Sequence, residues 1–332
     1  MGMRTGHTVL PIPNGWFAIA SSSELVKGTV KRAFYFDREL VIFRTREGHV
    51  HVLDAYCPHL GAHLAEGGRV VGETIRCPFH AWQYDGDGRC VHIPYSKKDP
   101  PKKAVVFSWP VIERNGFVFA WHHSEKAPPS WDIPELPELH DDQWTEVRST
   151  SLTVPTHIQD MAENNCDPVH FRYVHGNLAL GTSEVLAGEA GHYFKALSRT
   201  TQETPLGSFE TELERETWGL GLVAVRVKGI GDAGLMMLAA TSPIDHETTQ
   251  SRWLYTVTKD MADLAGEDFI ARLGAGVQQD MQIWKNKIHR ATPVLCEADT
   301  ELAFFRKWVR QFYPKNGNGA AAVATAGEEA RA

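Results

Sequence analysis

The chain has 332 residues, of which 42% are hydrophobic and 23% charged, and its formal net charge is −7. This length fits about two domains with a sizeable core, and the acidic balance argues against nucleic acid as the main partner. No apolar run approaches the ~20 residues of a membrane helix. The N-terminus has no signal-peptide pattern, and five cysteines do not suggest a disulfide framework. We therefore expect a cytoplasmic protein without a membrane span.

Short β-strands are predicted over residues 14–125. Segments such as ELVIFRT, VHVLDAY and GFVFAW are rich in β-branched and aromatic residues, and turn sequences such as REGH and DGDGR separate them. Residues 126–144 that follow are rich in proline and acidic residues, a composition typical of an extended linker.

A second domain is predicted over residues 145–314. Apolar and polar residues alternate over much of residues 185–258, which indicates a large antiparallel sheet. From Asp263 to His289 the period becomes helical, and residues 315–332 are of low complexity and predicted to be disordered. The pattern as a whole predicts an α+β fold with an all-β N-terminal domain.

Two near-copies of one motif lie in the all-β segment, CPH at Cys57–His59 and CPFH at Cys77–His80. Two Cys and two His can bind zinc, but zinc fingers group Cys with Cys and His with His. Here each loop offers one Cys and one His, which resembles a Rieske [2Fe–2S] site. Cys57 and Cys77 would hold one iron, and His59 and His80 the other. A zinc site stays open as the alternative.

A second set of metal-ligand residues lies in the C-terminal domain. His170 and His175 are five residues apart, about 500° of rotation on a regular helix, so a bulge, a helix end or a bend must bring the two rings together. Asp280 falls on the apolar stripe of its predicted helix, where a lone carboxylate is costly unless it is paired or bound to metal. Two His and one carboxylate form the facial triad of non-haem Fe(II) oxygenases. The alternative is a structural His pair and a salt-bridged Asp.

With these motifs, the sequence resembles the oxygenase component of Rieske non-haem iron oxygenases over roughly residues 15–314. The segments VHVLDAYCPHLGAHL, CPFHAWQYDGDGRCVHIPY, HFRYVHG and QDMQIWKNKIH are similar to the branch of 3-ketosteroid 9α-hydroxylases and cholesterol 7-desaturases. The resemblance implies a helix-grip-like catalytic domain with long helices, a Rieske cluster, a mononuclear Fe(II) and O2 as co-substrate. Electrons from NAD(P)H would arrive through a separate flavin-containing reductase, with or without a ferredoxin, because the chain has no G-x-G-x-x-G fingerprint.

The resemblance also implies roles for Asp167 and Asn164. Asp167 would accept a hydrogen bond from His170 and reach a Rieske histidine of a neighbouring subunit in a homotrimer. Asn164 matches the family's Asn near the iron, although many members have one more residue between this Asn and the Asp.

The branch resemblance implies a steroid or sterol-like substrate that is hydroxylated or desaturated. We expect an apolar substrate pocket lined by Val277, Met281 and Trp284 on the predicted helix and by Met236, Met237 and Leu238 on a predicted strand. No cationic side chain can be assigned to the pocket from the sequence. The alternatives are an aromatic or other hydrophobic ring substrate, demethylation of such a substrate, or a pure electron carrier, and the second metal site argues against the carrier.

Overall fold

The computed structural model describes residues 7–176, 182–187, 191–204, 207–229, 231–266 and 275–314. The chain divides into two compact units, one of residues 16–133 and one of residues 1–15 with 134–332. The division after Ile133 falls inside the predicted linker. The predicted tail 315–332 and residues 267–274 of the predicted helix lie outside the described residues.

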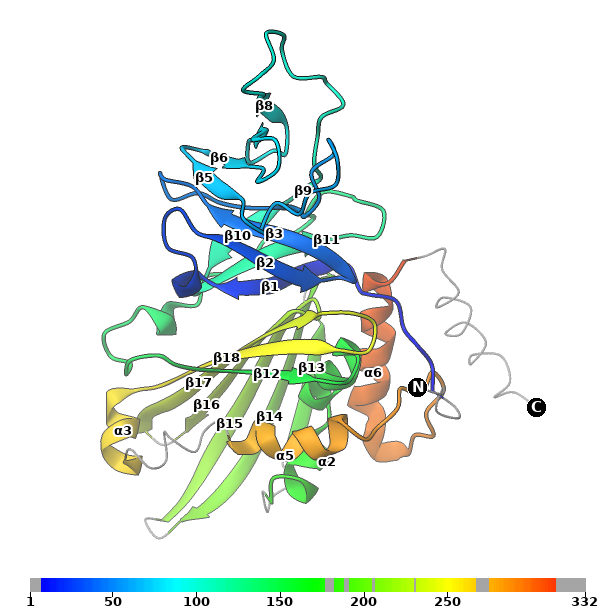
Figure 1. Ribbon diagram of the computed structural model, residues 1–332. Helices are drawn as coiled ribbons and strands as arrows, with labels where there is room; N and C mark the ends of the chain where they lie inside the picture. Colours follow the sequence, from blue (N-terminus) through cyan, green and yellow to red (C-terminus); the bar gives the residue numbers. More distant parts are fainter. Residues whose placement is uncertain are drawn as a thin grey trace, which may run out of the picture. The chain divides into compact units, whose positions relative to one another are not determined.

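The unit of residues 16–133 is built from three small antiparallel sheets (Figure 1). Their strand orders are β1-β11-β10, β2-β3-β4-β9 and β5-β6-β7-β8. The strands are β1 (Gly15–Ser21), β2 (Val30–Tyr35), β3 (Arg38–Arg44), β4 (Val50–Asp54), β5 (Arg69–Val71), β6 (Thr74–Arg76), β7 (Gln83–Tyr84), β8 (Cys90–His92), β9 (Ser108–Trp109), β10 (Val111–Arg114) and β11 (Phe117–His122), with a 3₁₀ turn η1 (Ser22–Glu24) after β1.

The β2–β3 hairpin illustrates how the local sequence forms these sheets. Phe36 and Asp37, its two loop residues, have φ of 58° and 57°, the left-handed backbone of a type I′ turn, which suits the twist of the flanking strands. Leu40 to Phe43 of β3 are all fully buried, so both faces of this strand pack inside the unit.

The second unit contains a seven-stranded antiparallel sheet of order β12-β18-β17-β16-β15-β14-β13, as Figure 1 shows. This sheet and the mostly β N-terminal unit confirm the predicted α+β class. The strands are β12 (Arg148–Val154), β13 (Thr182–Ala187), β14 (Tyr193–Thr204), β15 (Gly207–Trp218), β16 (Leu222–Gly229), β17 (Gly231–Pro243) and β18 (Thr249–Val257).

The described helices of this unit are short. They are α1 (Ile158–Ala162), α2 (Pro168–Tyr173), α3 (Lys259–Ala265), α5 (Ala275–Trp284) and α6 (Thr300–Val309), with 3₁₀ turns η2 (Pro137–Leu139), η3 (Glu163–Cys166), η4 (Glu297–Asp299) and η5 (Arg310–Phe312). In the part of the chain that the structure describes, none of the helices has the length and apolar character needed to traverse a membrane.

The segment α1–η3–α2 is interrupted at Asp167–Pro168. Asp167 caps α2: its Oδ1 accepts hydrogen bonds from the backbone N–H groups of Val169 and His170, at 3.0 and 3.2 Å. Pro168 occupies the first helical position, where a missing N–H costs nothing. The cap therefore starts a new helix just before the two predicted iron-binding histidines.

Candidate functional site

The two Cys/His loops of the N-terminal unit have matching backbone geometry. The N–H of Cys57 bonds to the carbonyl of Ala62, and the N–H of Cys77 bonds to the carbonyl of Trp82, each five residues further along. The residues before these acceptors, Gly61 and Ala81, both have left-handed φ, 75° and 59°. The sequence repeat is thus a structural repeat that presents one thiol and one imidazole from each loop.

The four predicted cluster ligands lie together on the two loops. Cys57 and Cys77 are free thiols with 3% and 2% exposure. The rings of His59 and His80 lie 4.7 Å apart between centroids. Each of these histidines has a buried Nδ1 without a hydrogen-bond partner, which is costly unless a metal takes the lone pair. This set of donors fits a [2Fe–2S] cluster.

Neighbouring side chains shape the electronic environment of these ligands. Trp82 packs beside the site: its ring stacks on that of His59, with 4.3 Å between ring centroids and an interplanar angle of 9°. The hydroxyl of Tyr84 lies 3.0 Å from Sγ of Cys57. Burial raises the pKa of the Cys77 thiol, while hydrogen bonds from the backbone of Phe79 and His80 oppose that rise.

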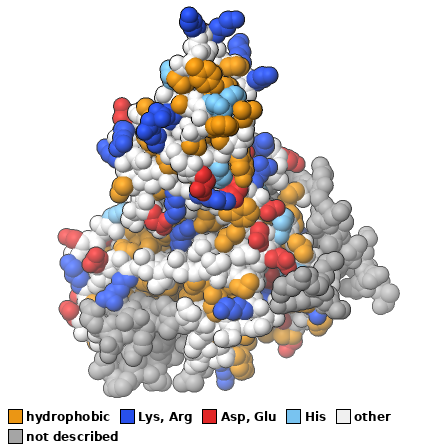
Figure 2. All heavy atoms as spheres, in the orientation of Figure 1, with side chains coloured by type: hydrophobic (Ala, Val, Ile, Leu, Met, Phe, Trp, Pro, Cys, Tyr) orange, Lys and Arg blue, Asp and Glu red, His pale blue; other side chains and the backbone are white. Residues whose placement is uncertain are grey.

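Apolar side chains are exposed around the two loops. Figure 2 shows hydrophobic side chains, with basic ones beyond them, at the end of the unit that carries β8. The exposed hydrophobic residues of this region are Tyr56, Leu60, Phe79, Val91 and Tyr95, which are 48–65% exposed. Such a surface is typical of a protein contact.

The structure brings His170, His175 and Asp280 together, with one ligand atom of each lying within 4.8 Å of the others. The histidine rings are 5.3 Å apart between centroids, and Nε2 of His175 lies 3.4 Å from Oδ2 of Asp280. Oδ1 of Asp280 is buried and has no hydrogen-bond partner. Because a buried, half-used carboxylate beside two imidazoles needs a cation, the site fits a mononuclear iron.

A helix end resolves the five-residue spacing of the two histidines. His170 lies inside α2, whereas His175 follows its C-cap, Val174, and precedes Gly176, whose φ is 73°. The chain leaves the helix there, so the ring of His175 can turn toward that of His170. Of the three predicted possibilities, a bulge, a helix end or a bend, the structure has the helix end.

Each histidine has its Nδ1 engaged, which leaves Nε2 to face the site. Nδ1 of His170 bonds to the backbone carbonyl of Asp167. Nδ1 of His175 lies 2.8 Å from Oε1 of Gln279 on α5, a partner that the sequence pattern did not reveal. The hydrogen bond with Asp280 raises the pKa of His175, and burial lowers that of His170. Contacts of this kind fix the tautomer of a metal-binding imidazole.

Asp167 accepts hydrogen bonds from His170, as predicted. The backbone carbonyl of Asp167 accepts from the ring Nδ1, its carboxylate accepts from the backbone N–H of His170, and Oδ2 lies 3.9 Å from Nδ1. The carboxylate caps α2 and its side chain is 38% exposed. Its bridging role stays a prediction. Asn164 is half-buried and lines the same cavity as the triad.

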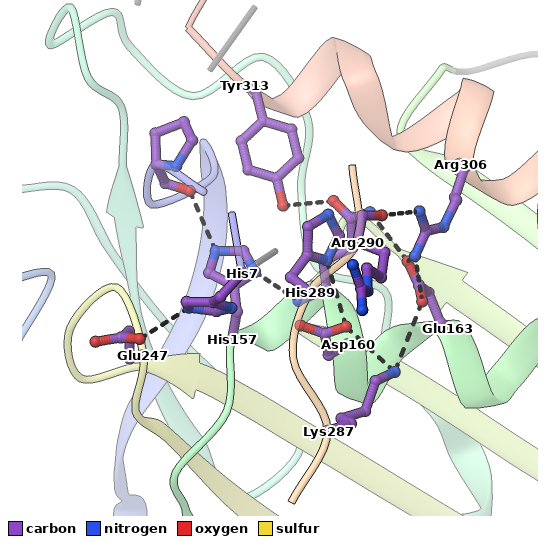
Figure 3. A network of polar contacts seen from close by, with 12 residues as sticks. His7, His157, Asp160, Glu163, Glu247, Lys287, His289, Arg290, Arg306 and Tyr313 are labelled. Carbon is purple, nitrogen blue, oxygen red and sulfur yellow. Dashed lines mark hydrogen bonds and ion pairs between the residues drawn. The ribbon is translucent and has the colours of Figure 1, made fainter. Parts of the chain in front are cut away.

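A buried polar network lies around the segment that carries these residues (Figure 3). Asp160 on α1 contacts Nζ of Lys287 at 3.2 Å and His289 at 3.3 Å. Nη2 of Arg306 on α6 lies 2.9 Å from Oε1 of Glu163 on η3. Asp160, Glu163 and His289 are close enough to hold a metal. However, Lys287 and Arg306 already neutralise the charges of both carboxylates, so we interpret the network as structural.

A cavity of about 290 Å³ adjoins the triad. Its walls come from α1, η3, α2, α5 and one face of the sheet, and include Met161, Leu213, Val225, Met237, Trp253, Val277 and Trp284. Three of the apolar residues expected in the lining are not there: Met236, Leu238 and Met281. Met236 and Leu238 flank Met237 on β17, and alternation sends them to the opposite face. Met281 packs against Val277 and Trp284 without reaching the cavity.

The expectation about charge also needs correction, because a cationic side chain does line the cavity. Arg215 of β15 is 1% exposed and contributes to the cavity wall. In the sequence it stands among acidic residues in FETELERETW, where an arginine is most simply explained as a partner of surface carboxylates. Its inward position follows from the register of the sheet, which pairs it with Val225 of β16, another residue of the wall.

Two domain families match the chain. Residues 120–313 match the 3-ketosteroid 9α-hydroxylase C-terminal domain, and residues 15–110 match the Rieske [2Fe–2S] domain. Cholesterol 7-desaturase of Drosophila melanogaster is 31% identical over 335 residues, which cover 92% of this chain and 76% of that protein. A probable 3-ketosteroid-9-alpha-monooxygenase oxygenase component of Rhodococcus rhodochrous is 30% identical over 318 residues, with coverages of 90% and 79%.

Solved structures share the fold. Dicamba monooxygenase bound to dicamba has a TM-score of 0.74 at 20% identity and covers 92% of this chain and 98% of its own. NdmA of Pseudomonas putida with caffeine also has a TM-score of 0.74, at 19% identity, with 94% of each chain covered. The chain therefore belongs to the Rieske non-haem iron oxygenases, in the branch defined by the 3-ketosteroid 9α-hydroxylase C-terminal domain.

Proposed function

We propose that this protein is the oxygenase component of a multi-component monooxygenase that hydroxylates or desaturates a steroid or sterol-like polycycle. As a member of its family it is an oxidoreductase that works with a Rieske cluster and a mononuclear iron. The observation that carries the substrate proposal is a mostly apolar cavity walled by the His170–His175–Asp280 triad itself.

The residues proposed to hold the two groups are the Cys/His set of the N-terminal unit and the His/Asp triad beside the cavity. Cys57 and Cys77 would bind one iron of the cluster, and His59 and His80 the other. His170, His175 and Asp280 would bind the mononuclear iron. When bound, these groups supply electron transfer and the reductive activation of O2. The electrons would come from NAD(P)H through a separate flavin-containing reductase.

The cavity walls would bind, orient and dehydrate the substrate. The volume of about 290 Å³ lies near the lower end of ligand pockets, which span roughly 300–1,000 Å³. Burial of an apolar skeleton there would contribute about 25 cal/mol per Å² before the costs of association. Gln279 would hold His175 in one orientation through Nδ1, and the ion pairs of Asp160 and Glu163 would hold α1 and η3, which contribute to the same wall.

Relatives support the polycycle. The Drosophila and Rhodococcus relatives are both named for sterol or steroid substrates. The solved structures of the same fold contain dicamba and caffeine, so a smaller ring compound, oxygenated or demethylated, is the second candidate.

Product formation tests the proposal. The holoprotein is reconstituted with a surrogate ferredoxin and reductase, and products are identified by mass spectrometry with a 3-ketosteroid, a sterol and a benzoate-type acid. We expect oxidation of at least one polycycle that depends on O2, NAD(P)H and the reductase. Turnover of the acid alone would reject the polycycle and leave the family assignment intact.

A further inference from the structure

We propose that Arg215 is the polar anchor of the cavity, and that the substrate carries an acceptor oxygen, a carbonyl or a carboxylate, which binds its guanidinium. The inference rests on the proposed function, because it names a chemical feature of the polycycle that the same cavity would bind.

The donors of Arg215 are largely unused. Nη2 donates to Oγ of Ser198 at 2.7 Å, with Ser183 at 3.5 Å. Nε and Nη1 are buried and have no hydrogen-bond partner among the described residues. Two serine hydroxyls leave most of the five N–H donors of a guanidinium without an acceptor. A buried donor without an acceptor is costly, so a ligand that supplies one is favoured.

The charge of Arg215 is also uncompensated at contact distance. Within the described part of the chain, no carboxylate forms an ion pair with it, whereas Arg226 on the adjacent strand pairs with Glu138 and Glu216. Burial lowers the pKa of Arg215, and the more distant Cys166, Glu301 and Asp167 oppose this shift. An arginine remains protonated even so, and the wall therefore presents a positive charge that has no ion-pair partner among the described residues.

Other unpartnered polar groups of the cavity wall agree with this reading. The indole nitrogens of Trp253 and Trp284 are buried without an acceptor, and both residues line the cavity. These groups, like those of Arg215, are donors only. Among the described residues of the wall, the buried acceptor without a partner is Oδ1 of Asp280, which belongs to the proposed iron site. Donors thus predominate among the buried, unpartnered groups of this wall, and carbonyl or carboxylate oxygens complement them.

The anchor lies close to the proposed iron site. Cζ of Arg215 is 5.6 Å from the centroid of the Phe171 ring, and that ring is 5.7 Å from the ring of His175. Phe171 itself lines the cavity. An oxygen bound at Arg215 would therefore fix which part of the skeleton lies next to the triad, which makes Arg215 a candidate determinant of the oxidised position.

Binding of matched ligands to the iron-loaded protein tests the anchor. Dissociation constants are measured by quenching of tryptophan fluorescence for two pairs: a 3-ketosteroid and its analogue with CH2 in place of the carbonyl, and a steroid side-chain acid and its analogue with a terminal methyl group. A benzoate-type acid is the third arm. A hydrogen bond to a charged group predicts that at least one oxygenated ligand binds about 10- to 100-fold more tightly than its partner.

Variants assign this preference to the guanidinium. We expect Arg215→Met to bind both members of the favoured pair equally and Arg215→Lys to keep part of the preference. Thr217→Val, two residues along the same strand and outside the cavity wall, should behave as wild type. Circular dichroism and iron content confirm the fold of each variant. The pair that discriminates identifies the ligand group as a carbonyl or a carboxylate.

The outcomes separate this inference from the proposed function. Polycycles that bind equally with and without oxygen in wild type would overturn the anchor and leave the proposed function standing, and this comparison needs no variant to fold. Discrimination that persists in Arg215→Met would also overturn the anchor. Arg215-dependent binding of the benzoate-type acid, with no binding of any polycycle, would keep the anchor and reject the polycycle.

Discussion

Tyr84 directly contacts a proposed cluster ligand. Its hydroxyl lies 3.0 Å from Sγ of Cys57, and its ring packs in the apolar cluster that surrounds both cysteines. Burial raises the pKa of Tyr84, and the neighbouring Cys57 raises it further, so the hydroxyl keeps its proton and would donate it to a ligating thiolate. Hydrogen bonds to the sulfurs are one of the determinants of the reduction potential of an iron–sulfur cluster.

Replacement of Tyr84 by Phe should lower the reduction potential of the cluster. The donated hydrogen bond favours the reduced cluster, which carries one more negative charge. Its loss of about 1 kcal/mol corresponds to roughly 40 mV for one electron. A redox titration followed by the EPR signal of the reduced cluster measures the shift. Tyr95→Phe, which removes the acceptor of the Trp82 indole instead, is the matched control, and an unchanged potential in Tyr84→Phe would contradict the role.

At the scale of elements, α1 depends on a histidine that must remain neutral. His157 caps this helix: its Nδ1 accepts from the N–H of Gln159 at 3.1 Å, and its Nε2 lies 3.2 Å from the carbonyl of Pro11, to which it donates. The residue is 4% exposed, and burial lowers its pKa to about 4. The neutral ring satisfies both contacts, whereas a protonated ring would lose the cap.

This neutral histidine predicts a pH dependence of stability. The unfolded chain binds a proton at His157 near pH 6.5 and the folded chain only near 4. The free energy of unfolding should therefore fall by about 3 kcal/mol from this residue as the pH falls from 6.5 to 4. Urea unfolding across this range should show a weaker dependence in His157→Asn. His49→Asn, at an exposed histidine, is the control, and an equal slope in wild type and His157→Asn would refute the prediction.

At the scale of the whole molecule, the exposure of Asp167 leads us to expect that several copies of the chain form an oligomer. One oxygen of its carboxylate caps α2, while the side chain remains 38% exposed, so a group from another subunit could reach it. We expect a ring-shaped homo-oligomer, a trimer, in which head-to-tail contacts close and Asp167 links the cluster of one subunit to the iron site of the next. Light scattering after size-exclusion chromatography measures the mass, and a monomer with full turnover would exclude this arrangement.

Asp167→Asn should keep both metal sites and the helix cap but slow electron transfer between them. Asn caps a helix about as well as Asp, so the change removes the charge rather than the structure. Rapid-mixing measurement of cluster re-oxidation, with substrate and O2 present, reports the rate. Asp280→Ala is the contrasting variant, because it should lose the mononuclear iron alone. Metal analysis of the same samples checks the metal content of both variants. An unchanged rate of cluster re-oxidation in Asp167→Asn would contradict a bridging role for Asp167.

The sequence by itself determined the features that depend on short stretches of chain. Each Cys/His loop carries its two ligand residues within four positions, so local backbone geometry presents them together. The break at Asp167–Pro168 follows from a capping side chain and from a residue that lacks an N–H. The alternation over the second domain predicted the antiparallel sheet. An apolar stripe with one carboxylate singled out Asp280.

Only the tertiary structure decided the contacts between distant segments. Gln279 lies 104 residues from His175 in the chain, and Tyr84 lies 27 residues from Cys57; neither pairing has a local signature. Alternation with period two does not say which face of a strand points inward, so the inclusion of Met237 and Arg215 in the cavity wall and the exclusion of Met236 depended on strand register. From the sequence alone, an arginine among glutamates is expected to be exposed to solvent or paired with surface carboxylates. Its burial depends on the assembled sheet and helices and cannot be read from any single segment.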